Sequence, residues 1–446
     1  MPKGVPIVFF IIPLLVRLSV PVMADEQHAM TLDDCIKITL ENNPQLRASE
    51  MDIMASRGSY GIARSVLLPQ INAVADAQRT TSNIIVTSKS PYASVFYRQP
   101  DNTNYPYYTA SVTLSQQLFS FGKDYFGMRS ASESINAAQY NFINTRNTLI
   151  YSVRQNFFNI LQYNMIIEAD RYLLRQMETQ LDQARAYYRA GIKTKIDVLS
   201  AQTSLGNIKL SLITAENSKN IYILNLLSLM GLPLTAGIEF TGELTATTVT
   251  TDADAYVDMA LANRPDYLSL KKQLDAATYS YRQSISTYFP TLSGNASYNW
   301  TGQDFPLVWN WAIGLELDFN IFSGFQSTSA MEVARAQMLK MKYTIDEQRL
   351  SVELSVQSAL DNIEQAKKSI DVARDTLSQA GANLELVKKG YATGINNYLD
   401  FLTAVGTYQN AQSSYATALA SYNIAVANLE YVTGDTIENR SKDYEE

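Results

Sequence analysis

The chain has 446 residues, of which 46% are hydrophobic and 18% charged. That is enough apolar surface for two or three domains or one elongated domain, and it argues against a disordered polymer. With 36 Lys and Arg against 43 Asp and Glu, the chain lacks the clustered basic residues that nucleic acids require, so we expect no nucleic-acid partner. One Cys excludes an internal disulfide, and one His argues against a His-based metal site or a catalytic triad. We expect no cofactor.

The first 24 residues differ from the rest of the chain. Lys3 precedes an almost wholly apolar run (VPIVFFIIPLLV), and Val22 and Ala24 are the small residues that a signal peptidase reads. We interpret 1–24 as a secretory signal peptide, too short and too interrupted by proline to cross a bilayer as a helix. Cys35 follows no lipidation signal and is interpreted as a small buried helix residue.

No later stretch reaches the roughly 18 uncharged apolar residues that a transmembrane helix needs. Export still leaves three destinations open: the periplasm, the medium, and an outer-membrane barrel.

The rest of the chain contains one unit twice. Leu40, Asn42 and Pro44 recur at one constant spacing, and a longer block recurs at a second constant spacing without a gap. The first set recurs as Leu261, Asn263 and Pro265; the second pairs Phe119 with Phe322, Tyr188 with Tyr391, Gly191 with Gly394, Asp197 with Asp400, and Gly231 with Gly434. Matches that hold one register over such a length indicate an internal duplication.

The duplication gives the domain boundaries. We assign 25–231 to the first repeat, 232–255 to a Pro-, Gly- and Thr-rich linker, and 256–434 to the second repeat. The two spacings differ because the first copy has extra residues between Asn72 and Phe119, rich in Ser, Thr, Asn and Tyr as in a loop. The polar, charged stretch 435–446 is expected to be a disordered tail.

Each copy contains two short segments in which apolar and polar residues alternate. They cover 71–78, 108–118, 291–300 and 309–320, and the alternation predicts two β-hairpins. A soluble sheet packed on one face would show the same pattern. Strands of about ten residues with an apolar face, a polar face that includes carboxylates, and aromatic ends also fit a membrane barrel.

Aromatic residues favour the barrel. All three Trp of the chain lie near one hairpin end, as an interfacial belt requires. The candidate membrane-interface aromatics are Trp300, Trp309, Trp311, Tyr298 and Tyr108.

Two long stretches without proline, Lys123–Arg189 and Gln326–Thr393, predict helices. At 1.5 Å per residue each would be roughly 100 Å long, far more than a globular domain accommodates. Along both, a seam recurs in alternating steps of three and four residues, which indicates left-handed supercoiling. The seam begins Val352, Val356, Ala359, Ile363, Ala366 and Ile370 in the second copy, and Leu149, Val153, Asn156, Ile160, Tyr163, Ile167 and Asp170 in the first.

Each long helix is expected to turn at Gly191 or Gly394 and to return as a shorter helix, over 194–229 or 397–432. Helices over 44–67 and 265–288 would precede the first strand of each copy. A plain coiled-coil stalk is the alternative. It leaves unexplained why every long helix runs into a membrane-type strand.

Four barrel strands per chain imply an oligomer. An open strand edge in lipid is prohibitive, and closed membrane barrels need about eight strands or more. Two chains would give eight strands around a filled interior, whereas three would give twelve around a lumen. We therefore predict a mainly α fold with a membrane β-barrel: a cyclic homotrimer with twelve strands, continued by a long α-helical coiled-coil barrel. Both hairpin tips would lie outside the cell and all helices in the periplasm.

These features together resemble the TolC-type outer-membrane efflux family. The resemblance rests on the signal peptide, the Leu-x-Asn-x-Pro helix start, the duplicated strand-strand-helix-helix unit and the Tyr-x-x-Gly-x5-Asp turn in both copies, and it covers 31–434. It implies a trimeric channel-tunnel in the outer membrane of a Gram-negative bacterium, with the linker 232–255 in its equatorial region. Such a protein is the passive exit duct of a tripartite efflux or type I secretion system. Its partners would be a periplasmic adaptor (membrane fusion) protein, an inner-membrane pump and outer-membrane lipid.

The resemblance also implies a periplasmic tip. It would contain Tyr188, Gly191, Asp197, Tyr391, Gly394, Asn396, Asp400 and Thr403. Asp400 would ring the pore, and Tyr391 would bond the neighbouring hairpin near Asp197. Three symmetry-related Asp400 carboxylates would focus negative potential and favour cations.

Two departures from the family weaken the charge network of the tip. Asn396 stands where some members have Arg, and Thr403 stands where some have a second acidic residue. We therefore expect a less charge-locked tip. Each of Asp197 and Asp400 has a second possible role as a helix N-terminal carboxylate.

Lysines bracket both turns. Lys193, Lys195, Lys388 and Lys389 are candidate adaptor contacts, with solvated surface lysines as the alternative reading.

Two rival functions are disfavoured. A periplasmic coiled-coil adaptor or scaffold should carry one helical hairpin in small β-domains without aromatic-belted strands. An exported hydrolase needs a nucleophile and a base, yet no Gly-x-Ser-x-Gly or His-Glu-x-x-His occurs and His28 lies beside the mature N-terminus. We therefore expect no enzyme. Drug efflux, protein secretion and metal export use similar ducts, so the sequence specifies the duct and not the cargo.

Overall fold

The computed structural model describes residues 29–81, 104–246 and 252–434. The predicted signal peptide, the tail 435–446 and most of the first-copy insertion therefore lie outside the described residues. The described helices are α1 (Leu32–Asn42), α2 (Pro44–Ser65), α3 (Lys123–Arg189), α4 (Lys195–Leu229), α5 (Ala253–Asn263), α6 (Pro265–Ser286), α7 (Gln326–Thr393) and α8 (Tyr398–Thr433). The described strands are β1 (Gln70–Thr81), β2 (Asn104–Phe119), β3 (Thr291–Gly302) and β4 (Val308–Asp318).

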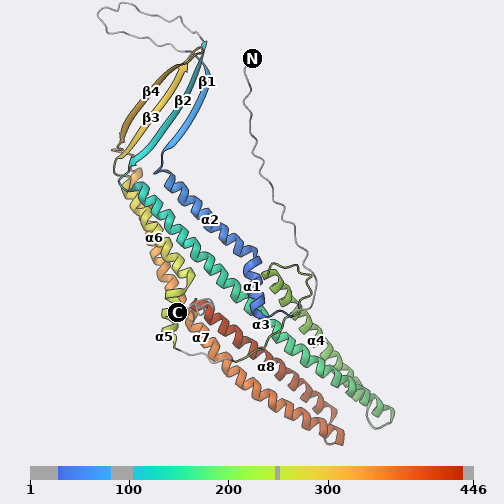
Figure 1. Cartoon of the computed structure of the whole chain (residues 1–446). Helices are drawn as coiled ribbons and strands as arrows, with labels where there is room; N and C mark the ends of the chain where they lie inside the picture. The colour runs from blue at the N-terminus through green and yellow to red at the C-terminus, as the bar shows by residue number, and fades with distance from the viewer. Residues whose placement is uncertain (1–28, 82–103, 247–251, 435–446) are drawn as a thin grey trace, which may run out of the picture.

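The molecule is elongated, with the sheet at one end and the α3–α4 and α7–α8 turns at the other (Figure 1). All four predicted strands and both long helices are confirmed, and the chain is mainly helical. No described helix combines the length and the apolar character that a membrane span requires.

The four strands form one antiparallel sheet in the order β1-β2-β3-β4. The central β2–β3 pair joins the two copies, and β1 and β4 are the edge strands. Because the partners are antiparallel, Tyr108 of β2 lies opposite Gly302 of β3. Both hairpin ends therefore lie at the end of the sheet that is far from the helices.

The register sorts the side chains into an apolar and a polar face. One row across the sheet joins Ala73, Val112, Tyr298 and Trp311, and the next joins Ile71, Leu114, Ala296 and Ile313. A row of the opposite face joins Val74, Ser111, Asn299 and Asn310. In the single chain the apolar face is exposed at β4, where Ile313 is 77% and Trp311 64% exposed.

Three apolar clusters form the core of the helical part. One lies where α1, α3 and α4 meet the stretch around Phe240. A second lies between α5, α7 and α8. The third cluster contains buried residues from both helical hairpins, α3–α4 and α7–α8. Met177 and Ala201 of the first hairpin pack in it with Phe401 and Val405 of the second. The two copies thus have separate cores in the middle and a shared core near the turns.

The repeated Leu-x-Asn-x-Pro and Gly motifs meet in space. Gly231 and Gly434 end α4 and α8 with φ of +66° and +70°. A side chain at either glycine would bring its Cβ within 2.9 Å of a backbone oxygen, that of Asn42 or Asn263 respectively. Gly231 therefore lets the end of α4 lie close to the α1–α2 junction, and Gly434 lets the end of α8 lie close to the α5–α6 junction. These close contacts explain why both copies have a glycine and a Leu-x-Asn-x-Pro motif at these positions.

The sequence analysis assigned no bounds to two short helices, α1 and α5. Thr31 begins α1 through a capping box with Asp34. Asp252 caps α5, because its carboxylate accepts from the Ala255 N–H at 3.3 Å. α5 consequently starts inside the stretch predicted as linker. Cys35 of α1 is fully buried, as predicted, and its burial raises the pKa of the thiol to about 12.

Candidate functional site

The candidate site consists of the two helical turns and the aromatic ends of the sheet. The first turn begins where α3 ends. Gly191 has a φ of +72°, and the Ile192 N–H donates to the Tyr187 carbonyl at 2.9 Å, as in a Schellman motif. Thr194 then caps α4, because its N–H donates to the Asp197 carboxylate at 3.0 Å.

The second turn repeats this geometry. Gly394 has a φ of +81°, and the Ile395 N–H donates to the Gly390 carbonyl at 2.8 Å. Asn397 caps α8: its side-chain oxygen accepts from the Asp400 N–H at 2.8 Å, and its own N–H donates to the Asp400 carboxylate at 3.1 Å. Asp197 and Asp400 are therefore both capping carboxylates, which is the second of the two roles the sequence left open.

The two repeated tyrosines lie in different surroundings. Tyr188 is 47% exposed, whereas Tyr391 is 8% exposed. The Tyr391 ring packs against Tyr398 at 5.3 Å and Phe401 at 5.9 Å between ring centroids. Lys193 of the first turn lies over the same ring, with its Nζ 4.8 Å from the centroid, a cation–π contact between the two hairpins.

Burial raises the pKa of Tyr391, and the negative charge of Asp197 raises it further. The pKa of Tyr398 is raised by burial above all. Neither hydroxyl forms a hydrogen bond with any described residue. Within the described part of one chain, the ring of Tyr391 is held by aromatic packing and by Lys193, and its hydroxyl bond to the neighbouring hairpin, which the family resemblance implied, stays a prediction.

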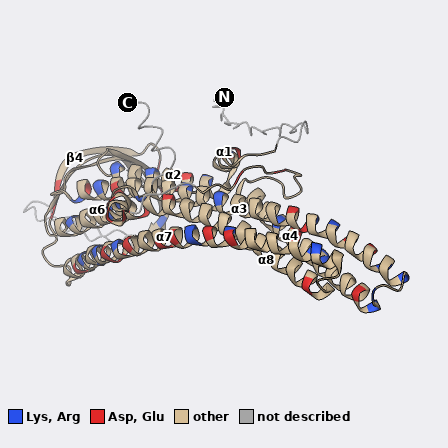
Figure 2. Cartoon of the chain, turned by 90° about the horizontal axis from the view of Figure 1, so that it is seen from below, with Lys and Arg blue, Asp and Glu red and all other residues tan. Residues whose placement is uncertain are grey.

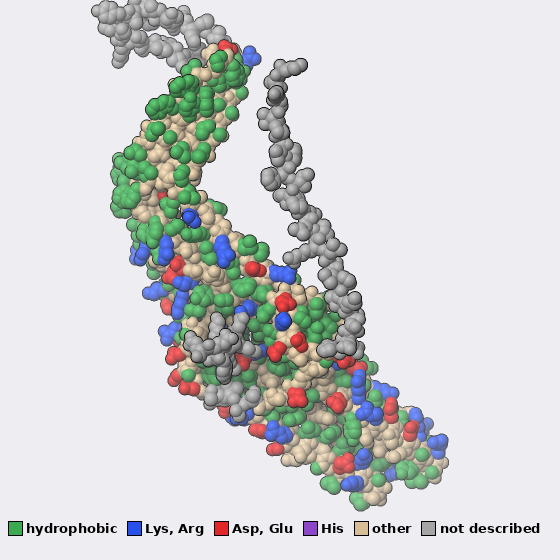
Figure 3. All heavy atoms as spheres, viewed as in Figure 1, with side chains coloured by type: hydrophobic (Ala, Val, Ile, Leu, Met, Phe, Trp, Pro, Cys, Tyr) green, Lys and Arg blue, Asp and Glu red, His purple; other side chains and the backbone are tan. Residues whose placement is uncertain are grey.

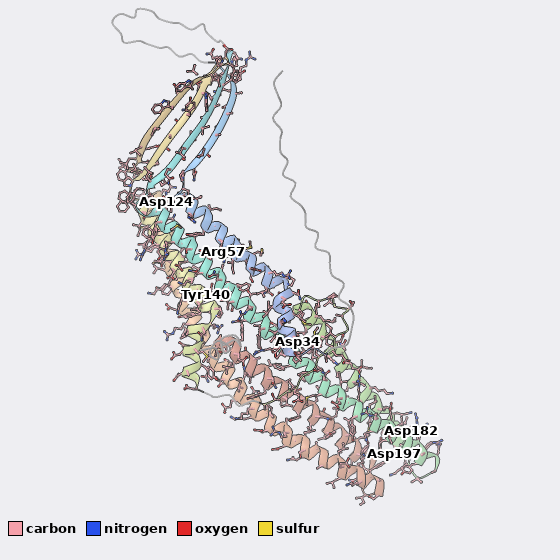
Figure 4. All side chains as sticks on the ribbon, in the orientation of Figure 1. Asp34, Arg57, Asp124, Tyr140, Asp182 and Asp197 are labelled. Atoms are coloured by element: carbon pink, nitrogen blue, oxygen red, sulfur yellow. The ribbon has the colours of Figure 1, made fainter. Side chains whose placement is uncertain are left out.

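The remaining tip residues surround this cluster. Asn396 is half-buried and lies against Gly390, where a Cβ would collide with its side-chain amide. Thr403 is exposed on α8 and donates to the Leu399 carbonyl of its own helix at 2.9 Å. Figure 4 shows Asp197 near the end of the molecule farthest from the sheet, with Asp124 where α3 leaves the sheet.

The four lysines divide into two pairs. Lys193 lies over Tyr391, and Lys388 donates to the Gln176 side-chain oxygen of α3 at 3.2 Å. Lys195 and Lys389 are exposed. Positions of Lys, Arg, Asp and Glu are spread along the helices toward these turns (Figure 2).

The predicted aromatics gather at the hairpin end of the sheet. The Trp300 and Trp309 positions pair across β3 and β4, as do Tyr298 and Trp311. The Tyr298 and Trp309 rings stack at 5.7 Å, and Tyr108 contacts Phe305 of the β3–β4 turn at 5.1 Å between centroids.

The sequence reasoning missed a second aromatic group, at the end where the sheet joins the helices. Its exposed members are Phe119, Phe121, Phe289, Phe319, Phe322 and Phe325. Phe121 stacks on Phe289 at 5.3 Å, which brings the two copies together. The repeat of Phe119 as Phe322 was a signal for this group. Figure 3 shows hydrophobic side chains over the sheet and charged ones over the helices.

Two aromatic belts on either side of an apolar sheet face match the two interfaces of a lipid bilayer. No set of three or more His, Cys, Asp or Glu in the described part of the chain is arranged to hold a metal ion. The fold and these sites define an outer-membrane channel protein with a large helical part in the periplasm.

The chain belongs to the outer membrane efflux protein family, whose model matches residues 35–232 and 256–435. It is 23% identical over 421 residues to the alkaline protease secretion protein AprF of Pseudomonas aeruginosa, covering 92% of this chain and 86% of AprF. It is 24% identical over 446 residues to the outer membrane protein TolC of Escherichia coli K12, covering 95% and 86% of the two chains.

Solved structures show the same fold. The CmeC outer membrane channel of Campylobacter jejuni superposes with a TM-score of 0.80 at 17% identity, covering 93% of this chain and 89% of that one. VceC of Vibrio cholerae superposes with a TM-score of 0.77 at 17% identity, covering 90% and 96%. This protein is an outer-membrane exit duct.

Proposed function

We propose that three copies of this chain form a passive export channel, each contributing its four strands to a twelve-stranded barrel. The observation that carries this proposal is the pair of edge strands. Among the described residues of one chain, β1 and β4 each pair with one strand, and Ile313 and Trp311 on the apolar face of the sheet are exposed. In lipid, unpaired strand edges are too costly to persist, so β4 of one protomer would pair with β1 of the next.

The helices would then continue the wall of the duct into the periplasm. The turns would form its narrow end, with Asp400 exposed on the helix that follows the second turn. Three such carboxylates around one axis would attract cations and repel anions. The duct itself would catalyse nothing and would take its driving force from a pump.

A periplasmic adaptor protein and an inner-membrane pump are the expected partners. Lys195 and Lys389 are the better adaptor contacts, because both are exposed. Lys193 and Lys388 already contact Tyr391 and Gln176 within the protomer. The cargo would be selected upstream, as the names of the relatives, from protease secretion to antibiotic efflux, suggest for such ducts.

Membrane fractionation with chemical cross-linking tests the assembly. We expect the protein in the outer-membrane fraction, as a trimer that forms cation-preferring channels in planar lipid bilayers. Recovery as a soluble periplasmic monomer would refute the channel and leave a scaffold role. Replacing Ile313 with Asp, on the proposed lipid face, should prevent insertion, whereas replacing Asn310 of the opposite face with Asp should not.

A further inference from the structure

A buried carboxylate interrupts the apolar seam of α3. Asp170 is 2% exposed and lies between the buried residues Ile167 and Leu173. Its Oδ2 accepts a hydrogen bond from the Ser211 hydroxyl of α4, and its Oδ1 accepts one from the Gln409 amide of α8, both at 2.7 Å. One side chain is thus bonded to both hairpins.

This arrangement costs stability. No Lys or Arg among the described residues forms an ion pair with Asp170, so the desolvation of the carboxylate is offset only by hydrogen bonds from neutral donors. At the equivalent position, related by the spacing that joins Tyr188 to Tyr391, the second copy has Ala373. The seam therefore accepts an apolar residue at this level, and the carboxylate calls for a separate explanation.

Further polar contacts between α3 and α8 suggest that Asp170 helps to align the two helices. The two helices run antiparallel (Figure 1), and each step along α3 is matched by an equal step back along α8. Three such contacts are Thr148 with Tyr431 at 3.3 Å, Gln162 with Thr417 at 2.9 Å, and Asp170 with Gln409 at 2.7 Å. We call this series the α3–α8 ladder. Of its three α3 residues, Asp170 alone is buried. The ion pair of the buried Arg154 with Glu430 also joins the two helices, outside this equal-step series and farther from the turns than Asp170.

We propose that Asp170 is a positioning residue that fixes the axial register of α8 on α3 and thereby holds the second turn beside the first. A buried polar group sets register in helical bundles because only one alignment satisfies it. Apolar side chains alone would pack nearly as well if α8 shifted along α3. Asp170 is the buried polar link between the two helices that lies nearest the turns, since the ion pair of Arg154 with Glu430 is farther from them. The tip cluster of Tyr391 and Lys193 lies beyond the ladder, so a slide would displace it.

This inference rests on the proposed function only in that displaced turns would widen the narrow end of the duct. The register itself is measurable without transport. Ile192 and Ile395, 66% and 83% exposed on the two turns, can each be replaced by Cys and spin-labelled. The native Cys35 is fully buried and should not react. Full-length chains diluted with unlabelled protein report the distance between the two turns of one protomer.

Four substitutions separate register from stability. Asp170→Leu makes the seam apolar, so we expect the melting temperature to hold or rise while the distance distribution broadens. Gln409→Leu removes only the bond between hairpins and should also broaden it. Ser211→Ala removes only the bond within the first hairpin and should leave it narrow, which makes it the matched control. Asp170→Asn keeps an acceptor for Gln409 and should restore the narrow distribution.

We expect the displaced population to rise roughly three- to tenfold in Asp170→Leu and Gln409→Leu, as the loss of one buried hydrogen bond predicts. A distribution as narrow as that of the native chain in both variants would overturn the inference. Equal broadening in Ser211→Ala and Gln409→Leu would also overturn it, because the effect would then not concern the link between hairpins. If Asp170→Leu fails to fold, the comparison of the distance distributions of Gln409→Leu and Ser211→Ala tests the inference. A native chain with a narrow distribution but no conductance would refute the duct and leave the register intact.

Discussion

The two turns have the same local design and different roles in the packing. Each has a glycine with positive φ, Gly191 or Gly394, followed by a capped helix with Asp at its third position. Tyr391 of the second turn is nevertheless buried, whereas Tyr188 of the first is exposed. The comparison teaches that duplication preserves the local chemistry of a turn, while contact between the copies assigns each copy its role.

The largest difference should come from truncating the repeated tyrosines. Tyr391→Ala removes a ring packed on Tyr398 and Phe401 and should lower the free energy of unfolding by on the order of 3 kcal/mol. Tyr188→Ala should cost less than about 0.5 kcal/mol, because that ring is exposed. Thermal or chemical unfolding of the detergent-solubilised protein measures both. Equal losses would show that the two tyrosines are equivalent after all.

Replacing the glycines that follow α8 and α7 should also lower stability by unequal amounts. Gly434→Ala meets both a φ of +70° and the Asn263 backbone oxygen, so we expect a loss of roughly 2 kcal/mol or more. Gly394→Ala meets only a φ of +81°, with nothing within 4 Å of the new Cβ, and should cost about 1 kcal/mol. Unfolding of the two variants side by side tests the difference. A costlier Gly394→Ala would contradict it.

Alkaline pH should act on the second turn more than on the first. The pKa values of Tyr391 and Tyr398 are raised above the ordinary tyrosine value of 10.0, so the unfolded chain releases these protons at lower pH than the folded chain does. Their contribution to stability is complete below pH 10 and is lost as the pH rises through the folded pKa values. The double variant Tyr391→Phe, Tyr398→Phe should therefore lose less stability between pH 9 and 11, as unfolding across that range would show.

At neutral pH the same double variant should be neutral or slightly more stable, because it removes two buried hydroxyls that have no hydrogen-bond partner in the part of the chain that the structure describes. A clear destabilisation at pH 7 would mean that the hydroxyls do find partners in the assembled protein.

The smallest effect on stability is expected at the capping carboxylates. Asp400→Asn keeps an acceptor for the Asn397 N–H and should cost less than about 1 kcal/mol. Under the trimer proposal it should nevertheless weaken cation preference and divalent-cation block in planar-bilayer recordings. Asp197→Asn, with the same capping role, is the control. Identical ion selectivity in the native chain and Asp400→Asn would remove Asp400 from the pore.

Much of the fold could be predicted from the sequence, because the long helices and the strands are indicated by patterns among residues that are close together in the chain. The absence of proline over Lys123–Arg189 and Gln326–Thr393 gave both long helices with the bounds that the structure has. Alternation gave the four strands and their apolar faces. The short helices α1 and α5 escaped notice, since each is only 11 residues long and is held in place by contacts distant in sequence, such as Gly231 with Asn42.

The candidate site could be read only in part. The repeated turn located Gly191, Gly394, Asp197 and Asp400, because a positive φ and a capping carboxylate leave a fixed spacing in the sequence. The aromatic belt beside the helices was missed because Phe121 and Phe289 come from segments far apart in the chain. No spacing rule joins them.

By itself, the sequence determined what depends on neighbours in the chain: helix length, strand face, turn type and the duplication. Only the tertiary structure decided which member of each repeated pair is buried. Asp170 accepts two hydrogen bonds because α4 and α8 both lie against it. Tyr391 contacts a cation because the first turn lies against its ring. Burial depends on what a second element brings into contact, and a pattern confined to one element does not contain that information.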